Sequence, residues 1–341
     1  MNRTTVRLLT LAGALLLLLS GCTPAPTEST IFAMDTVMTF KVWGKDAKAA
    51  VAEATERINA LDRLLSVSNE GSEIWAINHS DDPVTVSEDT AALIEAGLDL
   101  WQSTDGALDI AMYPVVRAWG FTTGEYRVVP EEERQELLAL TDLGNLQYDA
   151  QAGAVTAPAG MELDLGSLGK GYAGDRVMEI FRAHGIESAT ISLGGNVHTL
   201  GRKPDGSLWR IAVQDPEDQN SMVGILEVEN KAVITSGGYE RYFEENGQTY
   251  WHIMDPATGA PADSGLISVT VVGEQGVLCD GLSTALFIMG PDRAADYWRS
   301  RGGFDYLLIG ADHTIYLTEG LESSFILQKG YEDWPIRVVT S

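Results

Sequence analysis

The chain of 341 residues carries 23 Lys and Arg against 49 Asp and Glu, which gives a formal net charge of −26. So acidic a protein is not expected to bind nucleic acid, because affinity for phosphate backbones requires a basic face. Hydrophobic residues make up 45% of the chain, enough for a large core, and two cysteines, Cys22 and Cys279, provide no disulfide framework.

Residues 1–21 are typical of a lipoprotein signal peptide. Arg3 and Arg7 precede an apolar run over residues 8–19 that is too short to span a membrane. The run ends in LSGC at residues 19–22, which resembles a bacterial lipobox, so we expect lipidation of Cys22 and anchoring on the extracytoplasmic face of the cell membrane. Residues 22–30 are predicted to form a flexible tether and residues 31–341 the folded domain. The alternative is an ordinary cleaved signal with an incidental cysteine.

The hydrophobic pattern predicts helices and strands in mixed order. The first is a strand at 37–43, followed by helices at 46–66, from Ser87 as N-cap, and from Pro130. Further strands are predicted at 190–193, 209–213, 224–228, 232–235, 250–254 and 267–272, helices at 277–289 and 292–301, and strands at 306–309 and 314–317. This order indicates an α+β fold, because strands and helices do not alternate regularly.

The segment LDLGSLGKGY at residues 163–172 predicts a glycine-rich turn that leads into a helix. Free backbone N–H groups at a helix N-terminus bind phosphate, and Lys170 adds a positive charge. The spacing matches neither a P-loop nor a dinucleotide fingerprint. A turn with a helix cap, and no ligand, is the alternative reading.

A second candidate site lies in CDGLST at residues 279–284. Asp280 and Thr284 are four residues apart and share a helix face, and a carboxylate beside a hydroxyl is a reasonable pair of ligands for Mg²⁺. The alternative is a helix-capping Asp and a Thr that faces solvent. No motif for zinc or for a dedicated calcium site occurs.

Two further residues can carry chemistry. His252 and Met254 would share one face of the strand at 250–254, and a histidine there can accept a proton from an attacking hydroxyl. Asp109 lies in an apolar segment, so a buried carboxylate must cap a turn or bind a ligand. The segment TSGGYERY at 235–242 predicts a strand and a glycine turn, without a chemical role.

Taken together, these segments resemble the ApbE family of FAD:protein FMN transferases. The matching segments occur in order from residue 31 to beyond residue 290: AMDT at 33–36, DGALDI at 105–110, LDLGSLGKGYAGDR at 163–176, ISLGGN at 191–196, TSGGYERY, HIMDPATG at 252–259 and CDGLSTAL at 279–286. The resemblance implies a single α+β domain with mixed, mostly antiparallel sheets and flanking helices. It also implies Mg²⁺-dependent transfer of FMN from FAD to a Thr or Ser hydroxyl of an exported acceptor protein, with release of AMP.

The resemblance assigns roles to individual residues. His252 corresponds to the proposed base. The implied FAD contacts are Met34, Ala107, Leu108, Asp109, Asp164, Lys170 and Met254, and the implied residues around the metal are Ser167, Asp280, Ser283 and Thr284.

Two positions depart from the family pattern. Ser68 stands where relatives often place a Tyr against the flavin or adenine, so we count it among the FAD-binding positions without a stacking role. Ser283 stands where an Asp is common, which predicts weaker binding of Mg²⁺.

Three alternative functions stay open from the sequence. Weaker shielding of the diphosphate at Ser68 would allow hydrolysis of FAD to FMN and AMP. A non-catalytic FAD-binding lipoprotein is the second alternative, although such a protein has no need of a base. A solute-binding or adhesion lipoprotein is the third, and it predicts no binding of FAD.

Overall fold

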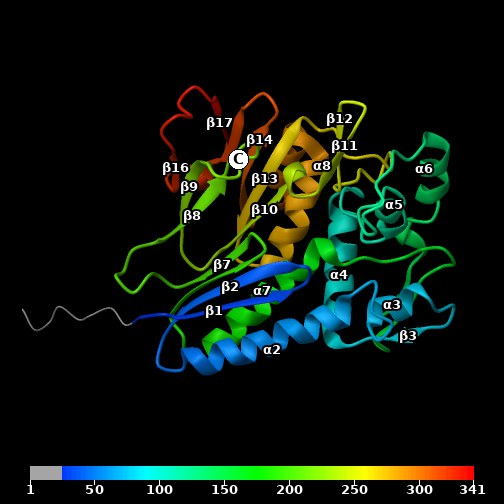
Figure 1. The fold of residues 1–341 in the computed structure, drawn as a ribbon, viewed down its shortest axis with the longest axis horizontal. Helices are drawn as coiled ribbons and strands as arrows, with labels where there is room; N and C mark the ends of the chain where they lie inside the picture. Colours follow the sequence, from blue (N-terminus) through cyan, green and yellow to red (C-terminus); the bar gives the residue numbers. More distant parts are fainter. Residues whose placement is uncertain (1–24) are drawn as a thin grey trace, which may run out of the picture.

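A nine-stranded sheet forms the centre of the molecule (Figure 1). The computed structural model describes residues 25–341, so the predicted signal peptide and Cys22 lie outside the described residues. The strand order is β1-β2-β6-β7-β10-β13-β14-β15-β17, and every neighbouring pair is antiparallel except β15 with β17. The strands are β1 (Thr27–Ala33), β2 (Thr36–Trp43), β6 (Ser188–Leu193), β7 (Asn196–Leu200), β10 (Ala232–Gly237), β13 (Leu266–Gly273), β14 (Phe304–Gly310), β15 (Ile315–Thr318) and β17 (Ile336–Val339).

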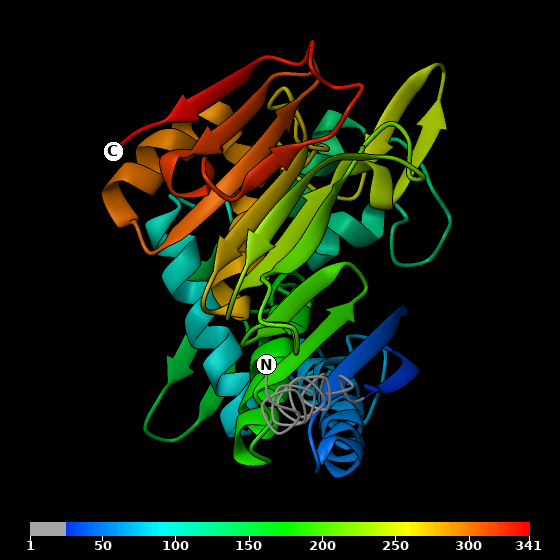
Figure 2. The ribbon, with the colours of Figure 1, turned by 90° about the vertical axis from the view of Figure 1, so that its left-hand side faces the viewer.

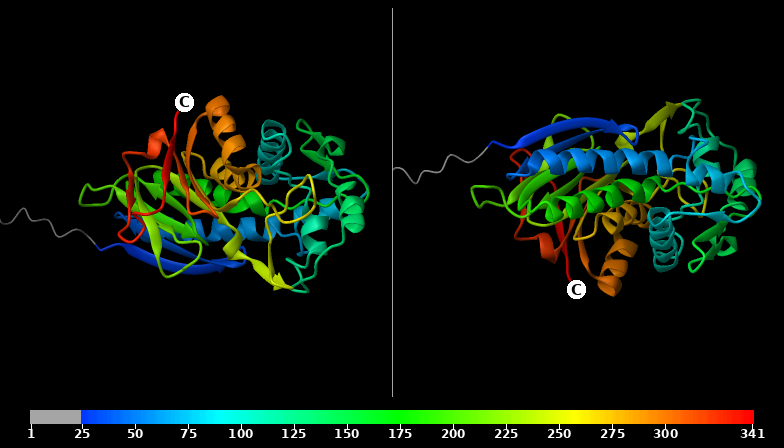
Figure 3. Two further views of the ribbon diagram at one scale, coloured as in Figure 1. Left: turned by 90° about the horizontal axis from the view of Figure 1, so that it is seen from above. Right: turned by 90° about the horizontal axis from the view of Figure 1, so that it is seen from below.

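Long helices cover one face of this sheet (Figures 2 and 3). Helix α7 (Gly166–Ala183) packs between α2 (Ala47–Leu65) and α8 (Gly276–Arg301), and α4 (Glu88–Ser103) packs against α7 and α8. Buried apolar side chains of these helices and of the sheet form the main core. The hydrophobic repeat therefore buries one stripe of each helix, as the sequence predicted for α2 and α4.

A smaller three-stranded sheet, ordered β16-β9-β8, covers part of the other face. Its strands are β8 (Trp209–Gln214), β9 (Met222–Val228) and β16 (Phe325–Leu327). A second apolar cluster lies between this sheet and strands β10, β13, β14 and β15. The nine-stranded sheet is consequently buried on both faces only at this end.

Shorter elements surround one end of the helices. They are α3 (Glu73–Asn78), α5 (Tyr113–Ala118), α6 (Glu131–Leu138), the sheet of β3 (Val84–Thr85), β5 (Ala154–Thr156) and β4 (Gln147–Asp149), the hairpin of β11 (Tyr242–Glu245) and β12 (Gln248–Trp251), and the 3-10 turns η1 (Leu143–Asn145) and η2 (Gly238–Glu240). The 3-10 turn η3 (Glu319–Leu321) lies instead beside β14 and contributes Leu321 to the second apolar cluster. The predicted α+β class with mostly antiparallel sheets is confirmed. Within residues 25–341, no helix combines the length and the apolar character needed to cross a bilayer.

The predicted tether over residues 22–30 is wrong for its last four residues. Thr27–Thr30 belong to β1, which pairs with β2 from Thr27 opposite Val42 to Ala33 opposite Thr36. Every second side chain of β1 is shielded and Ala33 is buried, so this polar-looking stretch is a strand with one face on the protein. The folded domain thus begins at Thr27.

The predicted glycine turn is also wrong, because Gly166, Gly169 and Gly171 lie inside α7. A Cβ atom on Gly171 would lie 2.2 Å from the carbonyl oxygen of Gly276 in α8. The glycines therefore allow two helices to approach closely. The two helices predicted at 277–289 and 292–301 are confirmed as the two halves of α8, whose backbone breaks between them at Gly290 (φ 76°), before Pro291.

The strand predicted at 250–254 ends earlier, at Trp251. The N–H of His252 still donates to the carbonyl of Arg241 (3.1 Å), and Met254 forms an isolated bridge with Pro261. His252 and Met254 are consequently loop residues held by single backbone contacts and not neighbours on one strand face.

Candidate active site

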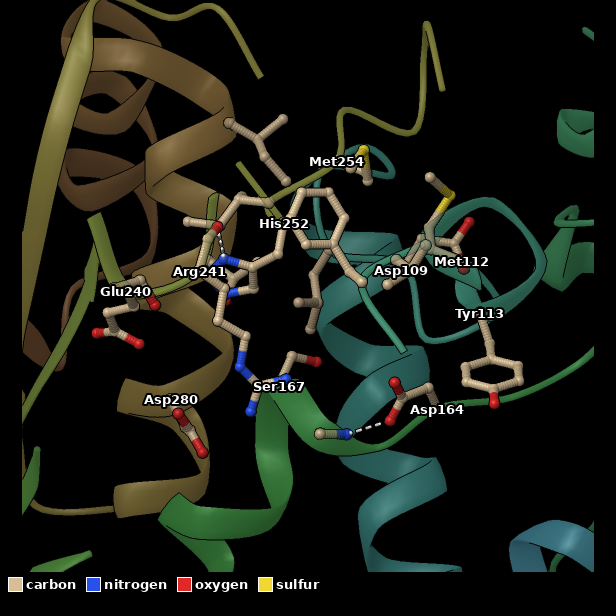
Figure 4. A pocket seen from close by; sticks show the side chains of 18 of the residues that line it. Asp109, Met112, Tyr113, Asp164, Ser167, Glu240, Arg241, His252, Met254 and Asp280 are labelled. Carbon is tan, nitrogen blue, oxygen red and sulfur yellow. Dashed lines mark hydrogen bonds between the residues drawn. The ribbon is translucent and has the colours of Figure 1, made fainter. Parts of the chain in front are cut away.

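The beginning of α7 and the Asp280–Ile288 segment of α8 border a cavity of about 250 Å³, which we call the central cavity. The loop before α5, the end of β10 with η2, and residues 252–256 complete its wall. Figure 4 shows the side chains of these elements pointing toward one another. Among the predicted site residues, those that line the central cavity are Ala107, Leu108, Asp109, Asp164, Ser167, Lys170, His252, Met254, Asp280 and Thr284.

Asp280 is buried at the crossing of α7 and α8 and is 4% exposed. Its Oδ2 accepts the N–H of Gly171 (2.7 Å), and its Oδ1 accepts Nδ2 of Asn196 in β7 (2.8 Å). Burial raises the pKa of Asp280, while the charge of Lys170 and the hydrogen bonds from Gly171 and Asn196 oppose that rise. A cation beside Asp280 would offset the cost of burying its charge.

The hydroxyls predicted around the metal separate into two groups. Thr284 lies one turn after Asp280 and Ser167 lies in the first turn of α7, and both line the central cavity. Ser283 does not line this cavity, and its predicted place beside the metal stays a prediction. Its buried hydroxyl donates to the carbonyl of Asp280 (2.7 Å) and shares a hydrogen bond with Ser236 (2.7 Å), because its side of α8 faces β10.

Asp164 lies two residues before the start of α7, and Lys170 lies one turn into the helix. Lys170 follows Ser167 by three residues and shares its helix face, at the positive end of the helix dipole. Asp164 accepts the N–H of Gly166 (2.8 Å), and burial raises the pKa of its carboxyl against the charges of Arg241 and Lys170. The arrangement places one cation and one hydrogen-bonded carboxyl beside free helix N–H groups.

Asp109 projects into the central cavity from the loop that precedes α5. One carboxyl oxygen accepts the N–H of Ala111 (2.7 Å). Burial raises the pKa of Asp109 to about 7, so the group is partly protonated near neutral pH and can donate a hydrogen bond as well as accept one. Ala107 and Leu108 are buried beside it and supply apolar surface.

His252 is half-buried, and its Nδ1 lies 3.3 Å from the carbonyl oxygen of Arg241. Burial, together with the positive charges of Arg241 and Lys170, lowers the pKa of His252 to about 4. The imidazole is therefore neutral at pH 7 and has a free lone pair, as a general base requires. Figure 4 shows the side chain of Arg241 extending from the His252 region toward Ser167.

Met34 and Ser68 line a second cavity of about 320 Å³, which we call the neighbouring cavity. The N–H of Met34, at the tip of the β1–β2 hairpin, donates to Oδ1 of Asp62 (3.0 Å). Both cavities share Tyr113 and Phe121 as well as the residues around Asp164 and Lys170. Because Ser68 is exposed and has no ring, Tyr113 and Phe121 are the aromatic side chains available to a planar ligand here.

Sequence reasoning missed three polar residues of the central cavity: Asn196, Glu240 and Arg241. Asn196 holds Asp280, and Arg241 acts on the charge of His252. Removal of water by the cavity wall raises the pKa of Glu240, and Lys170 opposes that rise. The adjacent Glu240 and Arg241, which follow the glycine pair and Tyr239 in TSGGYER, were the feature of the sequence that could have revealed these two residues.

The oxygen ligands of this site are suited to Mg²⁺ only when substrate phosphates complete the coordination of the metal. Among residues 25–341, no group of three His, Cys, Asp or Glu side chains could hold a metal ion. Asp280 offers carboxylate oxygens and Thr284 and Ser167 offer hydroxyls, all oxygen ligands of the kind that Mg²⁺ binds together with waters and phosphate oxygens. These residues therefore fit a metal that is shared with a diphosphate.

Comparisons with known proteins agree with this geometry. The model of the ApbE family matches residues 34–308. The FAD:protein FMN transferase of Klebsiella pneumoniae (strain 342) is 33% identical over 312 residues, which cover 86% of this chain and 89% of the relative. The FAD:protein FMN transferase of Escherichia coli (strain K12) is 32% identical, with 91% of this chain and 95% of the relative covered.

Solved structures show the same fold. The ApbE protein of Thermotoga maritima superimposes with a TM-score of 0.82 at 32% identity, covering 88% of this chain and 99% of that one. The flavin transferase ApbE of Vibrio cholerae gives a TM-score of 0.79 at 29% identity, covering 88% and 100%. The family predicted from the sequence motifs is confirmed, and this chain belongs to the ApbE family.

Proposed function

We propose that this chain, as an FAD:protein FMN transferase, attaches FMN to a Thr or Ser hydroxyl of an exported acceptor protein with the help of Mg²⁺ and releases AMP. One observation carries the proposal. Asp280, Lys170 and His252 surround a single cavity, so one metal-binding carboxylate, one phosphate-binding cation and one neutral base meet at the same place.

FAD would occupy the central and neighbouring cavities together. Tyr113 and Phe121 present apolar rings to the flavin or adenine, and Asp109, which titrates near pH 7, can hydrogen-bond a ring nitrogen or a carbonyl. Lys170 and the N-terminus of α7 would bind the diphosphate. With these contacts, the FMN phosphorus would lie beside Asp280.

Asp280, Thr284 and Ser167 would hold the metal. When bound, Mg²⁺ supplies positive charge to the diphosphate and to the AMP leaving group. Asn196 and the N–H of Gly171 fix the orientation of the Asp280 carboxylate, so its oxygens are positioned before substrate binds.

His252 would accept the proton of the acceptor hydroxyl as its oxygen attacks the FMN phosphorus in line with the departing AMP. Burial, together with the charges of Arg241 and Lys170, lowers the pKa of His252 and keeps the imidazole neutral before the substrates bind. The diphosphate then brings negative charge, which raises the pKa of His252 and makes it a stronger base.

The location follows from the lipobox at residues 19–22. We propose that Cys22 is lipidated and that the domain acts outside the cytoplasmic membrane, where an exported acceptor is reached. Because the chain carries a net charge of −26, attraction to anionic headgroups would not hold it there.

The test is an incubation of the purified protein with FAD, Mg²⁺ and an FMN-binding-domain protein, followed by intact-mass measurement of the acceptor. We expect one FMN on the acceptor and one AMP released, and neither with EDTA nor with Asp280→Ala. Free FMN and AMP without a labelled acceptor would identify FAD hydrolysis instead, the reaction that the exposed Ser68 would favour. No turnover of FAD would contradict an enzymatic function.

A further inference from the structure

A polar groove of about 1,020 Å³ crosses the outer face of the nine-stranded sheet. We call it the sheet groove, and its floor consists of β1, β2, β6 and the turn that leads into β7. The three-stranded sheet packs on the other end of this face and reaches β2 only at Trp43, whose ring lies 5.7 Å from that of Trp209 in β8. The groove is the largest of the cavities described and has no part in the mechanism above.

The floor is polar because side chains alternate along each strand. Met38, Phe40 and Val42 of β2 point into the core, so Thr39 and Lys41 point out. Pairing places Thr30, Thr39 and Ser192 side by side across β1, β2 and β6. A row of hydroxyls on a flat sheet offers hydrogen bonds to an extended chain.

The opposite wall comes from β8 and the β8–β9 turn. Ala212 is exposed on β8, and Asn220 and Met222 continue the wall, with Met222 41% exposed. Two of the groove's basic side chains are paired, Lys41 with Glu28 (3.0 Å) and Arg210 with Glu227 (3.6 Å), and Glu240 adds a carboxyl at the end shared with the central cavity. The surface therefore suits an uncharged polar segment better than a strongly acidic or basic one.

The groove borders the central cavity along β10 and η2. Thr235 and Glu240 line both spaces. Gly194 and Gly195 on the groove floor lead directly to Asn196, which lines the central cavity and donates to Asp280. A segment lying in the groove thus ends beside the carboxylate that would hold the metal, whereas the neighbouring cavity joins at the Asp164 and Lys170 end.

We propose that the sheet groove binds the acceptor protein through an extended, uncharged segment that carries the hydroxyl to be modified. This inference rests on the proposed function, since it supplies the route by which the second substrate reaches the FMN phosphorus. FAD would occupy the central and neighbouring cavities. The sheet groove approaches the Asp280 side of the central cavity from the outer face of the sheet. The floor hydroxyls of Thr30, Thr39 and Ser192 can donate hydrogen bonds to the main-chain carbonyls of such a segment and accept them from its N–H groups.

The test blocks the groove from its two walls. Thr39→Trp fills the floor and Ala212→Trp fills the opposite wall, and both replace exposed strand residues outside the catalytic machinery. Thr85→Trp is the matched control, because Thr85 is an exposed strand residue of the distant β3–β5–β4 sheet. The readouts are KM and kcat for an FMN-binding-domain protein, and the affinity for FAD alone.

We expect each groove variant to raise the KM for the acceptor protein at least tenfold, with FAD affinity within twofold of wild type, while the control changes neither. A KM within twofold of wild type in both groove variants would overturn the proposal. Loss of FAD affinity in both would also overturn it, because the groove would then be part of the FAD site. A wild-type protein that transfers no FMN would overturn the proposed function first, and the acceptor groove with it.

Discussion

The charge of Arg241 should set the lower end of the pH range in which this enzyme works. His252 has a pKa lowered to about 4 by burial and by the positive charges of Arg241 and Lys170. At that value roughly one imidazole in a thousand is protonated at pH 7, so the base is available. Protonation removes the lone pair, so transfer is lost as the pH falls through the pKa of His252 in the substrate complex.

Arg241→Gln removes one of the two cations, so the pKa of His252 rises and the acid limb of the rate profile moves to higher pH. Unit charges ~10 Å apart interact by ~1.7 kcal/mol at an effective dielectric constant near 20, which is about one pKa unit. Arg241 is exposed, and solvent screening reduces the effect, so we expect a shift of about half a unit. His252→Ala should slow transfer by about 10²- to 10⁴-fold.

The assay is single-turnover release of AMP with FAD, Mg²⁺ and an acceptor protein, from about pH 4.5 to about pH 8. Arg202→Gln is the matched control, because Arg202 is an exposed cation paired with Glu229 (2.8 Å) outside both cavities. An acid limb that stays in place in Arg241→Gln would refute the electrostatic reasoning. A wild-type rate in His252→Ala would refute the assignment of the base.

Three further predictions concern the metal and the helix crossing. Asp280→Asn should reduce Mg²⁺-dependent transfer by about 10²-fold or more, because the remaining donors are neutral, and a Mg²⁺ titration of AMP release that matched wild type would contradict this. Thr284→Val should raise the half-saturating Mg²⁺ concentration, whereas Ser283→Ala should leave it within twofold of wild type, since Ser283 does not line the cavity. A larger increase in Ser283→Ala than in Thr284→Val would instead support the predicted role of Ser283 beside the metal. Gly171→Ala should lower stability by about 1–3 kcal/mol in thermal unfolding, because its Cβ would lie 2.2 Å from a carbonyl of α8, and Gly169→Ala, with 3.8 Å to its nearest neighbour, is the control that should not.

The sequence predicted the fold where local signals and burial agree. The helix from Ser87 begins as expected, with the Ser87 hydroxyl accepting the N–H of Thr90 (3.4 Å). The glycines of α7 were placed in a turn because glycine weakens isolated helices. Only the partner helix α8, more than a hundred residues away in the chain, explains why they are needed inside one. Residues 27–30 likewise become a strand through their pairing with β2.

The candidate site could be predicted for the residues that lie in the recognised sequence motifs. Ten of the predicted residues line one cavity, and Met34 and Ser68 line the space beside it. Asn196 and Arg241 escaped notice because their roles exist only across strands and loops that the chain brings together. Ser283 lies three residues after Asp280, but its hydroxyl is bonded to Ser236 of β10, and which side of α8 faces β10 cannot be read from spacing.

The position of β1 limits how far the domain can stand from a bilayer. Four residues lie between Cys22 and Thr27, where the strand begins, and the five residue-to-residue steps span at most about 18 Å when fully extended. If Cys22 carries the lipid as we propose, β1 is held within that reach of the headgroups, and β1 forms one side of the sheet groove. The enzyme would then modify acceptors whose hydroxyl lies close to the membrane surface, and not those that hold the hydroxyl far from it.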